Sequence, residues 1–477
     1  MVQKMLQFTK LDRVTPEKRD AEERTQDFGE IYREFAMEKA EQQAARCSQC
    51  GVPFCQSGCP LHNNIPDWLK ATAEGRLREA YELSSATNTF PEICGRICPQ
   101  DRLCEGNCVI EQSGHGTVTI GAVEKYITEV AWEEGWVDVP TPEQELEASV
   151  GIIGAGPAGL ACADRLRRAG VQVTVYDRYD RSGGLMIYGI PGFKLEKPIV
   201  IRRNEQLQKA GVTFVLNCKV GEDISFEEIR AKHDAVLIGT GVYKTREVAG
   251  PGVGMAGLVQ ALDYLTASNR KGLGDDVPDY DDGTLNAAGK NVVVIGGGDT
   301  AMDCVRTAIR QGAKSVKCLY RRDRANMPGS QREVANAEEE GVVFEWLTAP
   351  KGFIGDNQVT AVRAVRMRLG APDSTGRQAP EEIAGSDYDE PADLAIQALG
   401  FEPDDLPTLW GVDGLQVSRW GTIKADFRTH ETSLPGVYAA GDIVRGASLV
   451  VWAIRDGREA ADAMIDRILT GAAVAAE

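Results

Sequence analysis

The chain has 477 residues, enough for about three domains of ordinary size, and its composition is that of a globular protein. Its formal net charge of −18 excludes the basic surface that nucleic-acid binding requires, and no apolar run is long enough to cross a bilayer. Because the first residues lack the apolar core of a signal peptide, we expect a cytoplasmic location, where twelve cysteines indicate metal or redox chemistry rather than structural disulfides.

The first 46 residues are highly charged, and a helical pattern runs from about Asp27 to Arg46. The pattern is typical of a solvated helix, but it also suits an arm that packs on a partner. The sequence does not separate these two interpretations.

Eight cysteines form two quartets on either side of a helical stretch, Ile65–Leu83. The first quartet is Cys47, Cys50, Cys55 and Cys59, and the second is Cys94, Cys98, Cys104 and Cys108. Short-spaced thiolates converge on soft metals, and the Cys-Pro at the end of the first quartet is typical of two-cluster ferredoxins. Zinc is the main alternative and disulfides are a weaker one. Zinc modules usually pair Cys-x2-Cys with a second such pair or with two histidines, which this sequence lacks.

A βαβ fingerprint of a dinucleotide site begins at Val150. An apolar strand runs into Gly154, Gly156 and Gly159, a helix follows, and a second strand ends on Asp177, which can accept a ribose hydroxyl. The start of the helix offers free N–H groups to the phosphates. A second glycine turn, which includes Gly184 and Leu185, and two further strands at 212–220 and 235–241 complete this part.

A second βαβ unit begins at Asn291 and carries the Gly-x-Gly-x-x-Ala form of the fingerprint. Its turn and helix start contain Gly296, Gly298, Asp299 and Thr300. The strand that follows ends on Arg321 and Arg322 instead of an acid, and two guanidiniums suit the 2′-phosphate of NADPH. The alternative is a pair of solvated arginines at the start of a loop.

Residues 340–400 show mostly β patterns, and the strand before Gly441 and Asp442 then precedes a helix over about Leu449–Leu469. Asp442 could bond a ribityl chain, and the start of the helix could face the pyrimidine edge of a flavin. The chain is therefore expected to be an α/β protein: a helical iron–sulfur domain, then two doubly wound dinucleotide-binding domains with the NADPH domain inserted in the FAD domain. The expected boundaries are 1–147, 148–285, 286–390 and 391–477.

This order resembles the flavoproteins with two dinucleotide domains, which include the thioredoxin and glutathione reductases. The remaining cysteines form no short-spaced pair, so disulfide reduction is not expected. Over nearly its full length the chain is similar to the small subunits of bacterial NADPH-dependent glutamate synthases, and its front module also resembles dihydropyrimidine dehydrogenase. The resemblance is carried by the two quartets, Thr119–Glu124, Gly154–Gly159, Gly296–Ala301 and Tyr438–Asp442.

The resemblance implies two 4Fe–4S clusters with interleaved ligands. Cys47, Cys50, Cys55 and Cys108 would hold cluster one. Cys59, Cys98, Cys104 and Glu124 would hold cluster two, with Cys94 as the alternative fourth ligand, which the softness of thiolate favours. The residues expected at FAD are Gly154, Gly156, Gly159, Asp177, Gly184, Leu185, Val220, Gly241, Gly441 and Asp442.

The resemblance also implies a function. NADPH would reduce FAD, and the clusters would conduct electrons to a large FMN-containing α subunit that makes L-glutamate from L-glutamine and 2-oxoglutarate. No catalytic residue beyond the cofactor sites is identified. The alternatives are another ferredoxin:NADP-type or bifurcating oxidoreductase subunit, and a zinc-stapled binding module fused to a flavin reductase.

Overall fold

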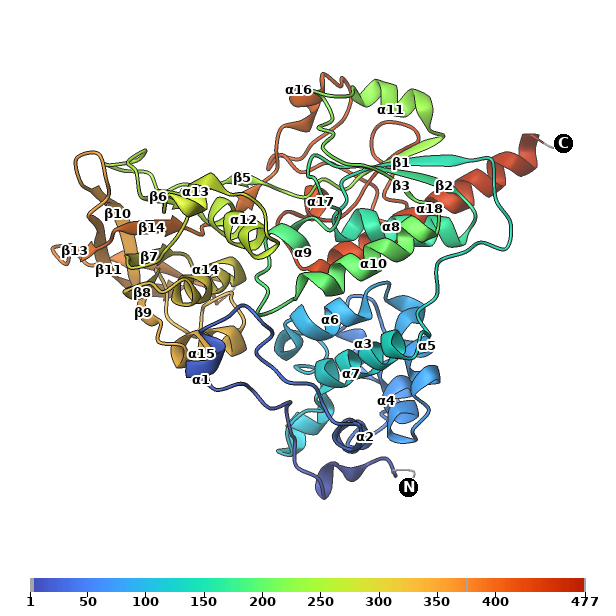
Figure 1. Cartoon of the computed structure of the whole chain (residues 1–477), viewed down its shortest axis with the longest axis horizontal. Coiled ribbons are helices and arrows are strands. Elements are labelled where there is room, and N and C mark those ends of the chain that lie inside the picture. The colour runs from blue at the N-terminus through green and yellow to red at the C-terminus, as the bar shows by residue number, and fades with distance from the viewer. Residues whose placement is uncertain (1–3, 375, 476–477) are drawn as a thin grey trace.

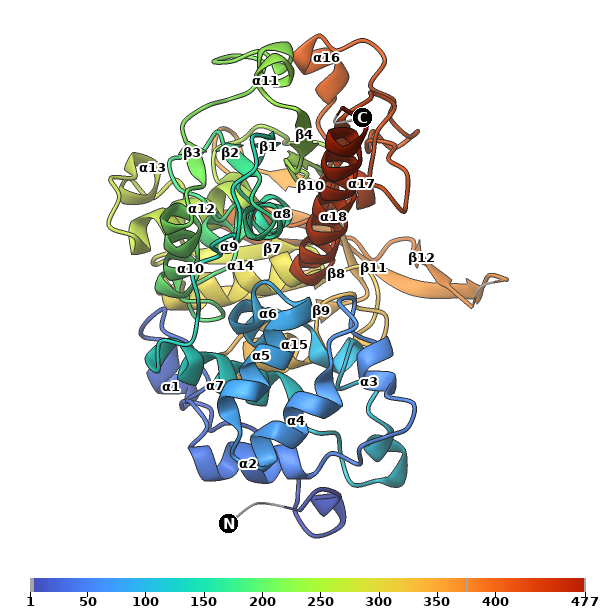
Figure 2. The same cartoon turned by 90° about the vertical axis from the view of Figure 1, so that its right-hand side faces the viewer.

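The computed structural model describes residues 4–374 and 376–475, which form three lobes (Figure 1). The N-terminal helices, in blue, form the lower lobe, and two α/β lobes lie above and beside it. The turned view in Figure 2 shows the long C-terminal helix α18 (Val450–Ala475) running down the upper lobe towards the blue helices. No helix among the described residues is long and apolar enough to cross a membrane.

The N-terminal lobe is a small helical domain with its own apolar core, which includes the fully buried Trp68 and the nearly fully buried Ile120. Its main helices are α2 (Met37–Ala45), α4 (Ile65–Ala73), α5 (Leu77–Thr87), α6 (Pro91–Ile97) and α7 (Ile120–Glu133). Short helices connect them: α3 (Phe54–Ser57) and 3-10 turns at Gln100–Arg102 and Val109–Ser113. Most cysteines of the two quartets lie in the connections or in short helices, where thiols from separate segments can converge, whereas Cys94 lies in the middle of α6.

The upper lobe is built on a parallel five-stranded sheet with the order β16-β4-β1-β2-β3. Its strands are β1 (Ser149–Ile153), β2 (Gln172–Tyr176), β3 (Thr213–Val215), β4 (Ala235–Ile238) and β16 (Val437–Ala439). Its helices are α8 (Pro157–Arg168), α9 (Leu185–Tyr188), α10 (Lys197–Lys209), α11 (Phe226–Lys232), α16 (Leu406–Trp410), α17 (Asp442–Arg445) and α18. Because β16 comes from near the end of the chain, this sheet combines segments from before and after the other α/β lobe.

That other lobe holds a second parallel sheet with the order β6-β14-β7-β8-β9. Its strands are β6 (Leu258–Gln260), β7 (Asn291–Ile295), β8 (Ser315–Tyr320), β9 (Val343–Trp346) and β14 (Leu394–Gln397). Its helices are α12 (Ala261–Gly272), α13 (Pro278–Asp281), α14 (Asp299–Arg310) and α15 (Gln331–Glu339). β6 and β14 lie outside the expected range 286–390, so the expected boundaries at both ends cut through this sheet.

Two connections mark where the chain enters and leaves the inserted lobe. β5 (Lys244–Thr245) and β15 (Phe401–Glu402) pair antiparallel between the two sheets. An antiparallel layer, β10 (Thr348–Ile354), β11 (Ala361–Pro372), β12 (Gln378–Glu382) and β13 (Tyr388–Pro391), completes the inserted lobe. The expected insertion of one dinucleotide fold in the other is therefore confirmed.

Three expected elements differ from the structure. The pattern over Asp27–Arg46 contains only α2, because the residues before it form an extended hairpin that packs on the rest of the chain. The stretch Ile65–Leu83 is two helices separated at Gly75, where φ is +74°. The strand expected over 212–220 ends at Val215, because Asn217 adopts a left-handed conformation with φ +52°.

Glycine is required where each fingerprint turns from strand to helix. Gly154 has φ +110°, and a Cβ there would lie 2.4 Å from the carbonyl oxygen of Gly239. Gly296 has φ +148°, and its Cβ would lie 2.2 Å from the carbonyl oxygen of Ala398. Each strand therefore passes close to the end of the next strand in its sheet, and a side chain would force the two apart.

Candidate functional site

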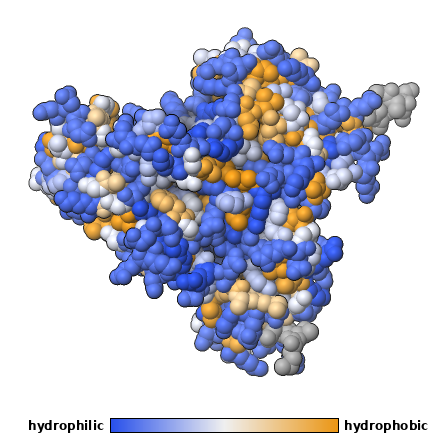
Figure 3. Space-filling view, viewed as in Figure 1, coloured by the Kyte–Doolittle hydropathy of each residue, from blue (hydrophilic) through white to orange (hydrophobic). Residues whose placement is uncertain are grey.

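One large cavity, of about 860 Å³, lies where the three lobes meet. The upper lobe contributes the first fingerprint and the start of α18, the inserted lobe contributes the start of α14, and the helical lobe contributes Gly95–Pro99. The face of the molecule drawn in Figure 3 is mainly hydrophilic, with apolar residues showing where the lobes come together. Both dinucleotide fingerprints and one cysteine of the second quartet thus border the same space.

The first fingerprint presents bare backbone to this cavity. A Cβ built on Gly156 would meet nothing within 4 Å, whereas one built on Gly159 would lie 2.0 Å from the carbonyl oxygen of Gly154. Gly156 therefore leaves room for a ligand beside the backbone, and Gly159 allows α8 to pack closely on β1. These are the spatial requirements of a pyrophosphate at the start of a helix.

Asp177, expected to hold a ribose, lines the cavity but also holds the glycine turn. Its carboxylate accepts hydrogen bonds from the backbone N–H groups of Ala155 at 2.6 Å and Tyr179 at 2.8 Å. Burial raises its pKa, and these two bonds oppose the increase. A carboxylate has further lone pairs, so a ribose hydroxyl can be added to these contacts.

Gly441 and Asp442 line the cavity next to the first fingerprint, and so do the first residues of α18, Val450 and Val451. Burial raises the pKa of Asp442 to about 6. The expected positions of Gly184, Leu185 and Gly241 also border the cavity.

Val220 does not line this cavity. It is 8% exposed and packs in a hydrophobic core with Tyr176 and Phe226.

In the second fingerprint, Asp299 and Thr300 line the cavity at the start of α14. A Cβ on Gly298 would meet nothing within 4 Å, as at Gly156. The N-terminus of the twelve-residue helix α14 is therefore open to an anion, in the same way as that of α8.

Arg321 and Arg322 follow β8, away from the residues that line the cavity. Arg321 is exposed, and Arg322 is half-buried. The Nε and Nη2 donors of Arg322 are buried without a hydrogen-bond partner among the described residues. Uncommitted guanidinium donors at the end of the second strand of a fingerprint suit a phosphate group.

A charged pair that was not expected from the sequence lies in the cavity between the two nucleotide-binding parts. Lys194 of the upper lobe donates to Asp303 of α14 at 2.8 Å, and both side chains are largely buried. Burial raises the pKa of Asp303 to about 6, while Lys194 opposes the increase. The spacing from Asp299 to Asp303 on one helix face was the available signal. No motif marks Lys194.

The four thiols expected at cluster one lie together. A small cavity is lined by Cys47, Cys50, Cys55 and Cys108, with apolar neighbours. Burial raises the pKa of Cys55 to about 12, and the other three thiols of the set add to the increase. Cysteine binds a metal as the thiolate. Ionising these buried thiols is therefore unfavourable unless a cation is bound.

The second set lies around Cys98, which also borders the large cavity. The pKa of Cys98 is raised mainly by a hydrogen bond with Cys94 and, to a smaller extent, by burial. Burial raises the pKa of Cys59 to about 11, and the nearby Glu124 and Cys94 add to it. Burial likewise raises the pKa of Cys104, with Cys59 and Glu124 among its charged neighbours. The interleaved sets implied by the resemblance are therefore close in space.

Glu124 is buried, 9% exposed, on α7 and is not a surface glutamate. Ser84 and Asn88 donate to its Oε1 through long hydrogen bonds of 3.3 and 3.4 Å. Burial raises its pKa to about 8. Cys94 is also buried and hydrogen-bonds with Cys98, and its Sγ lies 3.7 Å from Oδ1 of Asn88. Both residues are therefore candidates for the fourth ligand.

The spacing of the thiols does not suit zinc. Tetrahedral zinc holds sulfur at about 2.3 Å, which puts the sulfurs about 3.8 Å apart. Within the described ranges, no three cysteine thiols come within 4.8 Å of one another. A four-iron cluster does not require its ligand sulfurs to be that close together, so this spacing favours an iron–sulfur cluster over a single zinc ion.

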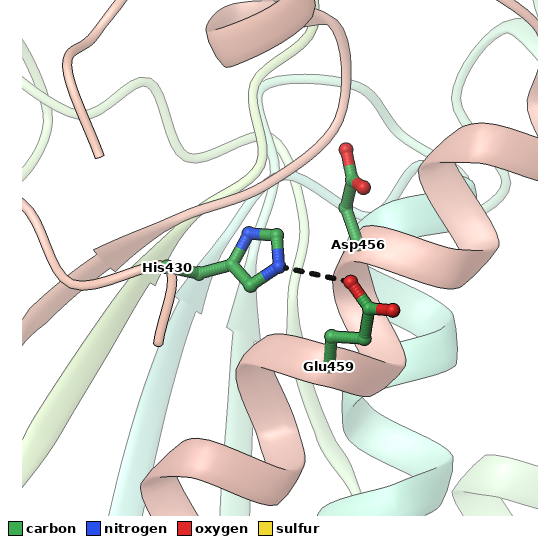
Figure 4. Close-up of side chains that lie close together, drawn as sticks. All are labelled: His430, Asp456 and Glu459. Atoms are coloured by element: carbon green, nitrogen blue, oxygen red, sulfur yellow. Dashed lines mark hydrogen bonds and ion pairs between the residues drawn. The ribbon is translucent and has the colours of Figure 1, made fainter. Parts of the chain in front are cut away.

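One other group of possible metal ligands stands outside the cavity (Figure 4). His430, Asp456 and Glu459 have potential ligand atoms within 4.8 Å of one another, and His430 Nε2 lies 3.3 Å from Glu459. Both acids are already committed, because Arg445 binds Asp456 through two contacts of 2.6 Å and Arg455 binds Glu459 at 2.7 Å. The group is an ion-pair network that ties α18 to its surroundings.

Two family models match the chain, one on each side of the join between the helical lobe and the α/β lobes. A model described as dihydropyrimidine dehydrogenase domain II, 4Fe-4S cluster, matches residues 24–136. A model described as pyridine nucleotide-disulphide oxidoreductase matches residues 148–457. These matches confirm the expected fold class and support an iron–sulfur cluster in the helical lobe and FAD and NADPH in the α/β lobes.

A solved structure shows the same fold in the α/β part. Mycobacterium tuberculosis FprA in complex with NADPH aligns with a TM-score of 0.58 and 20% identity, covering 69% of this chain and 86% of FprA.

Two relatives match over nearly the whole chain. The glutamate synthase (NADPH) small chain of Azospirillum brasilense is 66% identical over 460 residues, which cover 96% of this chain and 95% of the relative. The glutamate synthase (NADPH) small chain of Escherichia coli is 46% identical over 473 residues, which cover 98% and 99%. The chain therefore belongs to the family of glutamate synthase (NADPH) small chains, as an NADPH-dependent oxidoreductase with an iron–sulfur domain.

Proposed function

We propose that the chain oxidises NADPH with FAD and passes the electrons through two 4Fe–4S clusters to a large FMN-containing subunit. That subunit makes L-glutamate from L-glutamine and 2-oxoglutarate. The observation that carries the proposal is the single cavity bordered by both dinucleotide fingerprints and by Cys98 of the second cysteine set. A hydride donor, a flavin and a cluster would meet there without a long path between them.

The chain's own residues divide the work. The N–H groups at the start of α8 and α14 bind the two pyrophosphates, while Arg321 and Arg322 bind the 2′-phosphate. FAD, when bound, supplies the conversion between a two-electron hydride donor and one-electron acceptors. The start of α18 lies at the cavity with its positive dipole end, which favours negative charge on a reduced ligand.

The position of the first cysteine set supports an exit for electrons towards a partner. Cys50 and Cys55 flank a loop whose apolar side chains face solvent: Val52 is 64% exposed and Phe54 is 52% exposed. The second set borders the cavity, so the order from the cavity outwards is cluster two, then cluster one, then the surface.

The test is NADPH-dependent glutamate formation by this chain co-expressed with the large subunit, compared between the wild type and Cys98→Ser. We expect Cys98→Ser to lose a cluster and to stop glutamate formation, while NADPH still bleaches the flavin and reduces a small artificial acceptor. Cys218→Ala is the matched control, because Cys218 is buried outside both quartets. It should retain glutamate formation.

Two outcomes contradict parts of this proposal. Loss of flavin reduction in a folded, flavin-loaded Cys98→Ser variant would exclude the order NADPH, FAD, then clusters. A wild-type chain that reduces ferredoxin but supports no glutamate formation with the large subunit would assign it to the ferredoxin:NADP-type oxidoreductases.

A further inference from the structure

The charged segment before α2 is a hairpin on the surface of the NADPH-binding lobe. Residues 17–33 pair antiparallel: the N–H of Arg19 donates to the carbonyl of Ile31, and the N–H of Arg33 to that of Glu17, both at 2.9 Å. The short helix α1 (Ala21–Arg24) forms its tip. In Figure 1, α1 lies against α15 of the inserted lobe, far from the rest of the N-terminal helices.

Arg24 anchors this tip in the inserted lobe. Its side chain is 1% exposed, and its Nε lies 2.8 Å from Glu340, which follows α15. Its Nη2 lies 2.8 Å from Glu339 and 3.3 Å from the carbonyl of Asn336. Lys18 adds a contact of 3.2 Å to the side chain of Asn336. A fully buried arginine from one segment thus binds two adjacent acids of another.

Glu340, which Arg24 binds, is also bound by two arginines of the inserted lobe. Arg306 and Arg310 of α14 both bind Glu340, and Arg306 also binds Glu333. Arg24 brings a third guanidinium to the buried Glu340, and it shares the half-exposed Glu339 with Lys18 of the same hairpin. Burial of such charges is favourable only when they are paired.

The network reaches the nucleotide site through α14. This helix starts at Asp299, directly after the second fingerprint. The ring of Phe193, from the FAD-binding lobe, lies under the guanidiniums of Arg306 at 4.4 Å and Arg310 at 4.0 Å. Lys194, the next residue, binds Asp303 one helical turn after Asp299. Glu340, a partner of Arg24, therefore also binds the two arginines of α14 that pack on Phe193 of the FAD-binding lobe.

The base of the hairpin is attached to the other two lobes. Glu30 binds Arg96 of the cluster-bearing lobe at 2.5 Å and also binds Lys125 on α7. The ring of Phe28 lies 6.3 Å from that of Phe193. One hairpin thus joins the iron–sulfur lobe, the FAD-binding lobe and the NADPH-binding lobe.

We propose that the hairpin of residues 17–33 is a positioning segment for hydride transfer, and that Arg24 is its positioning residue. By completing the network around Glu340, Arg24 holds α14 and its bound nucleotide in register with the FAD-binding lobe. The inference rests on the proposed transfer of hydride from NADPH to FAD. Misplacement by about 1 Å can cost a hydride donor on the order of a hundredfold in rate, although its binding contacts are kept.

The experiment compares Arg24→Ala with the wild type in the full, cofactor-loaded chain. Rapid mixing with NADPH gives the limiting rate of flavin bleaching, and NADP⁺ titration gives Kd. We expect the limiting rate to fall about tenfold to a hundredfold, because of misplacement. Kd should change by less than about threefold, since Arg321 and Arg322 still bind the 2′-phosphate.

Two further variants distinguish a loss of positioning from a general loss of folded structure. Arg24→Lys keeps the charge without the guanidinium fork and should recover part of the rate. Arg33→Ala removes an arginine of the same hairpin whose side chain is 53% exposed and forms only long ion pairs with Glu17 and Glu23, so it should match the wild type. Hydrogen exchange should show faster exchange in α14 and α15 of Arg24→Ala alone.

The outcomes are distinct. If NADPH fails to bleach the flavin of the wild type, the proposed function is wrong. If the wild type is bleached and Arg24→Ala has an unchanged limiting rate, the positioning role is wrong. Weaker binding of NADP⁺ with an unchanged limiting rate of flavin bleaching also overturns the positioning role. So does an Arg24→Ala variant that bleaches slowly but shows unchanged hydrogen exchange in α14 and α15. If Arg24→Ala does not fold, the limiting rate of folded Arg24→Lys is compared with that of the wild type. A reduced rate then supports the positioning role, and an unchanged rate overturns it.

Discussion

At the scale of single residues, the main choice that remains is the fourth ligand of the proposed cluster two. Glu124 and Cys94 are both buried beside Cys59 and Cys98. Thiolate is the softer ligand, whereas the resemblance to the glutamate synthase small subunits indicates the carboxylate. The long hydrogen bonds of Glu124 to Ser84 and Asn88 leave it only weakly committed to the protein.

We therefore predict that Glu124→Ala perturbs the EPR signal and the potential of one cluster and leaves the other intact. Cys94→Ala, the matched comparison at the competing position, should retain both clusters. EPR of the reduced proteins and iron and sulfide content measure this. The reverse pattern, in which Cys94→Ala loses a cluster and Glu124→Ala is silent, returns cluster two to four cysteines.

The second prediction at this scale concerns the choice of nucleotide. Replacing Arg321 and Arg322 by alanine should weaken NADPH and hardly affect NADH. Each charged hydrogen bond to the 2′-phosphate contributes about 1.5–3 kcal/mol, or roughly ten- to a hundredfold in affinity. Kd values for both nucleotides measure the effect.

The control is Arg324→Ala, because Arg324 already pairs with Glu338 at 2.8 Å. It should leave the preference for NADPH unchanged. Equal losses for NADPH and NADH, or an unaffected NADPH, would remove the 2′-phosphate from Arg321 and Arg322.

At the scale of elements, the first residue of α10 is a lysine whose ammonium group binds carbonyl oxygens in α9 and just after it. Lys197 is 8% exposed and donates to the carbonyl oxygens of Met186, at 3.1 Å, and Ile190. Burial lowers its pKa from 10.5 to about 7, and Asp303 opposes the shift. Between these two values the unfolded chain binds more protons than the folded chain, so this lysine makes stability rise with pH.

We predict that Lys197→Met removes this dependence. The Tm of Lys197→Met minus that of the wild type should fall as the pH rises from about 7 to about 9. A difference of one bound proton between the unfolded and folded chains changes the free energy of unfolding by about 1.4 kcal/mol per pH unit. Lys209→Met, at the exposed end of the same helix, should show a constant difference. A constant difference for Lys197→Met as well would contradict the shifted pKa.

Elements also show where local pattern was sufficient and where it was not. The fingerprints of β1 and β7 were predictable because a continuous apolar strand and the glycine turn after it are local features. The hairpin of residues 17–33 was not, because its charges look like those of a solvated helix. Arg24 is buried only because Glu339 and Glu340, more than 300 residues away in the chain, approach it.

At the scale of the whole molecule, the inserted lobe decides what meets at the cavity. β5 and β15 carry the chain out and back, and β16 returns to the first sheet beside β4. The boundaries expected at 285/286 and 390/391 cut through the second sheet, because β6 and β14 are short strands whose partners are distant in sequence. Non-local pairing of this kind leaves no mark in a local pattern.

The sequence by itself determined the cofactor chemistry of this protein. Three patterns carried this prediction: the glycine turns, the arginines after β8 and the cysteine spacings. Each depends on residues close together in the chain, so each can be recognised without the tertiary structure. Only the tertiary structure decided what those sites share. The common cavity, the buried state of Glu124, the pair of Lys194 with Asp303 and the anchoring of Arg24 all depend on contacts between distant segments. Burial and pairing of charge arise from the folded arrangement, which no single stretch of sequence contains.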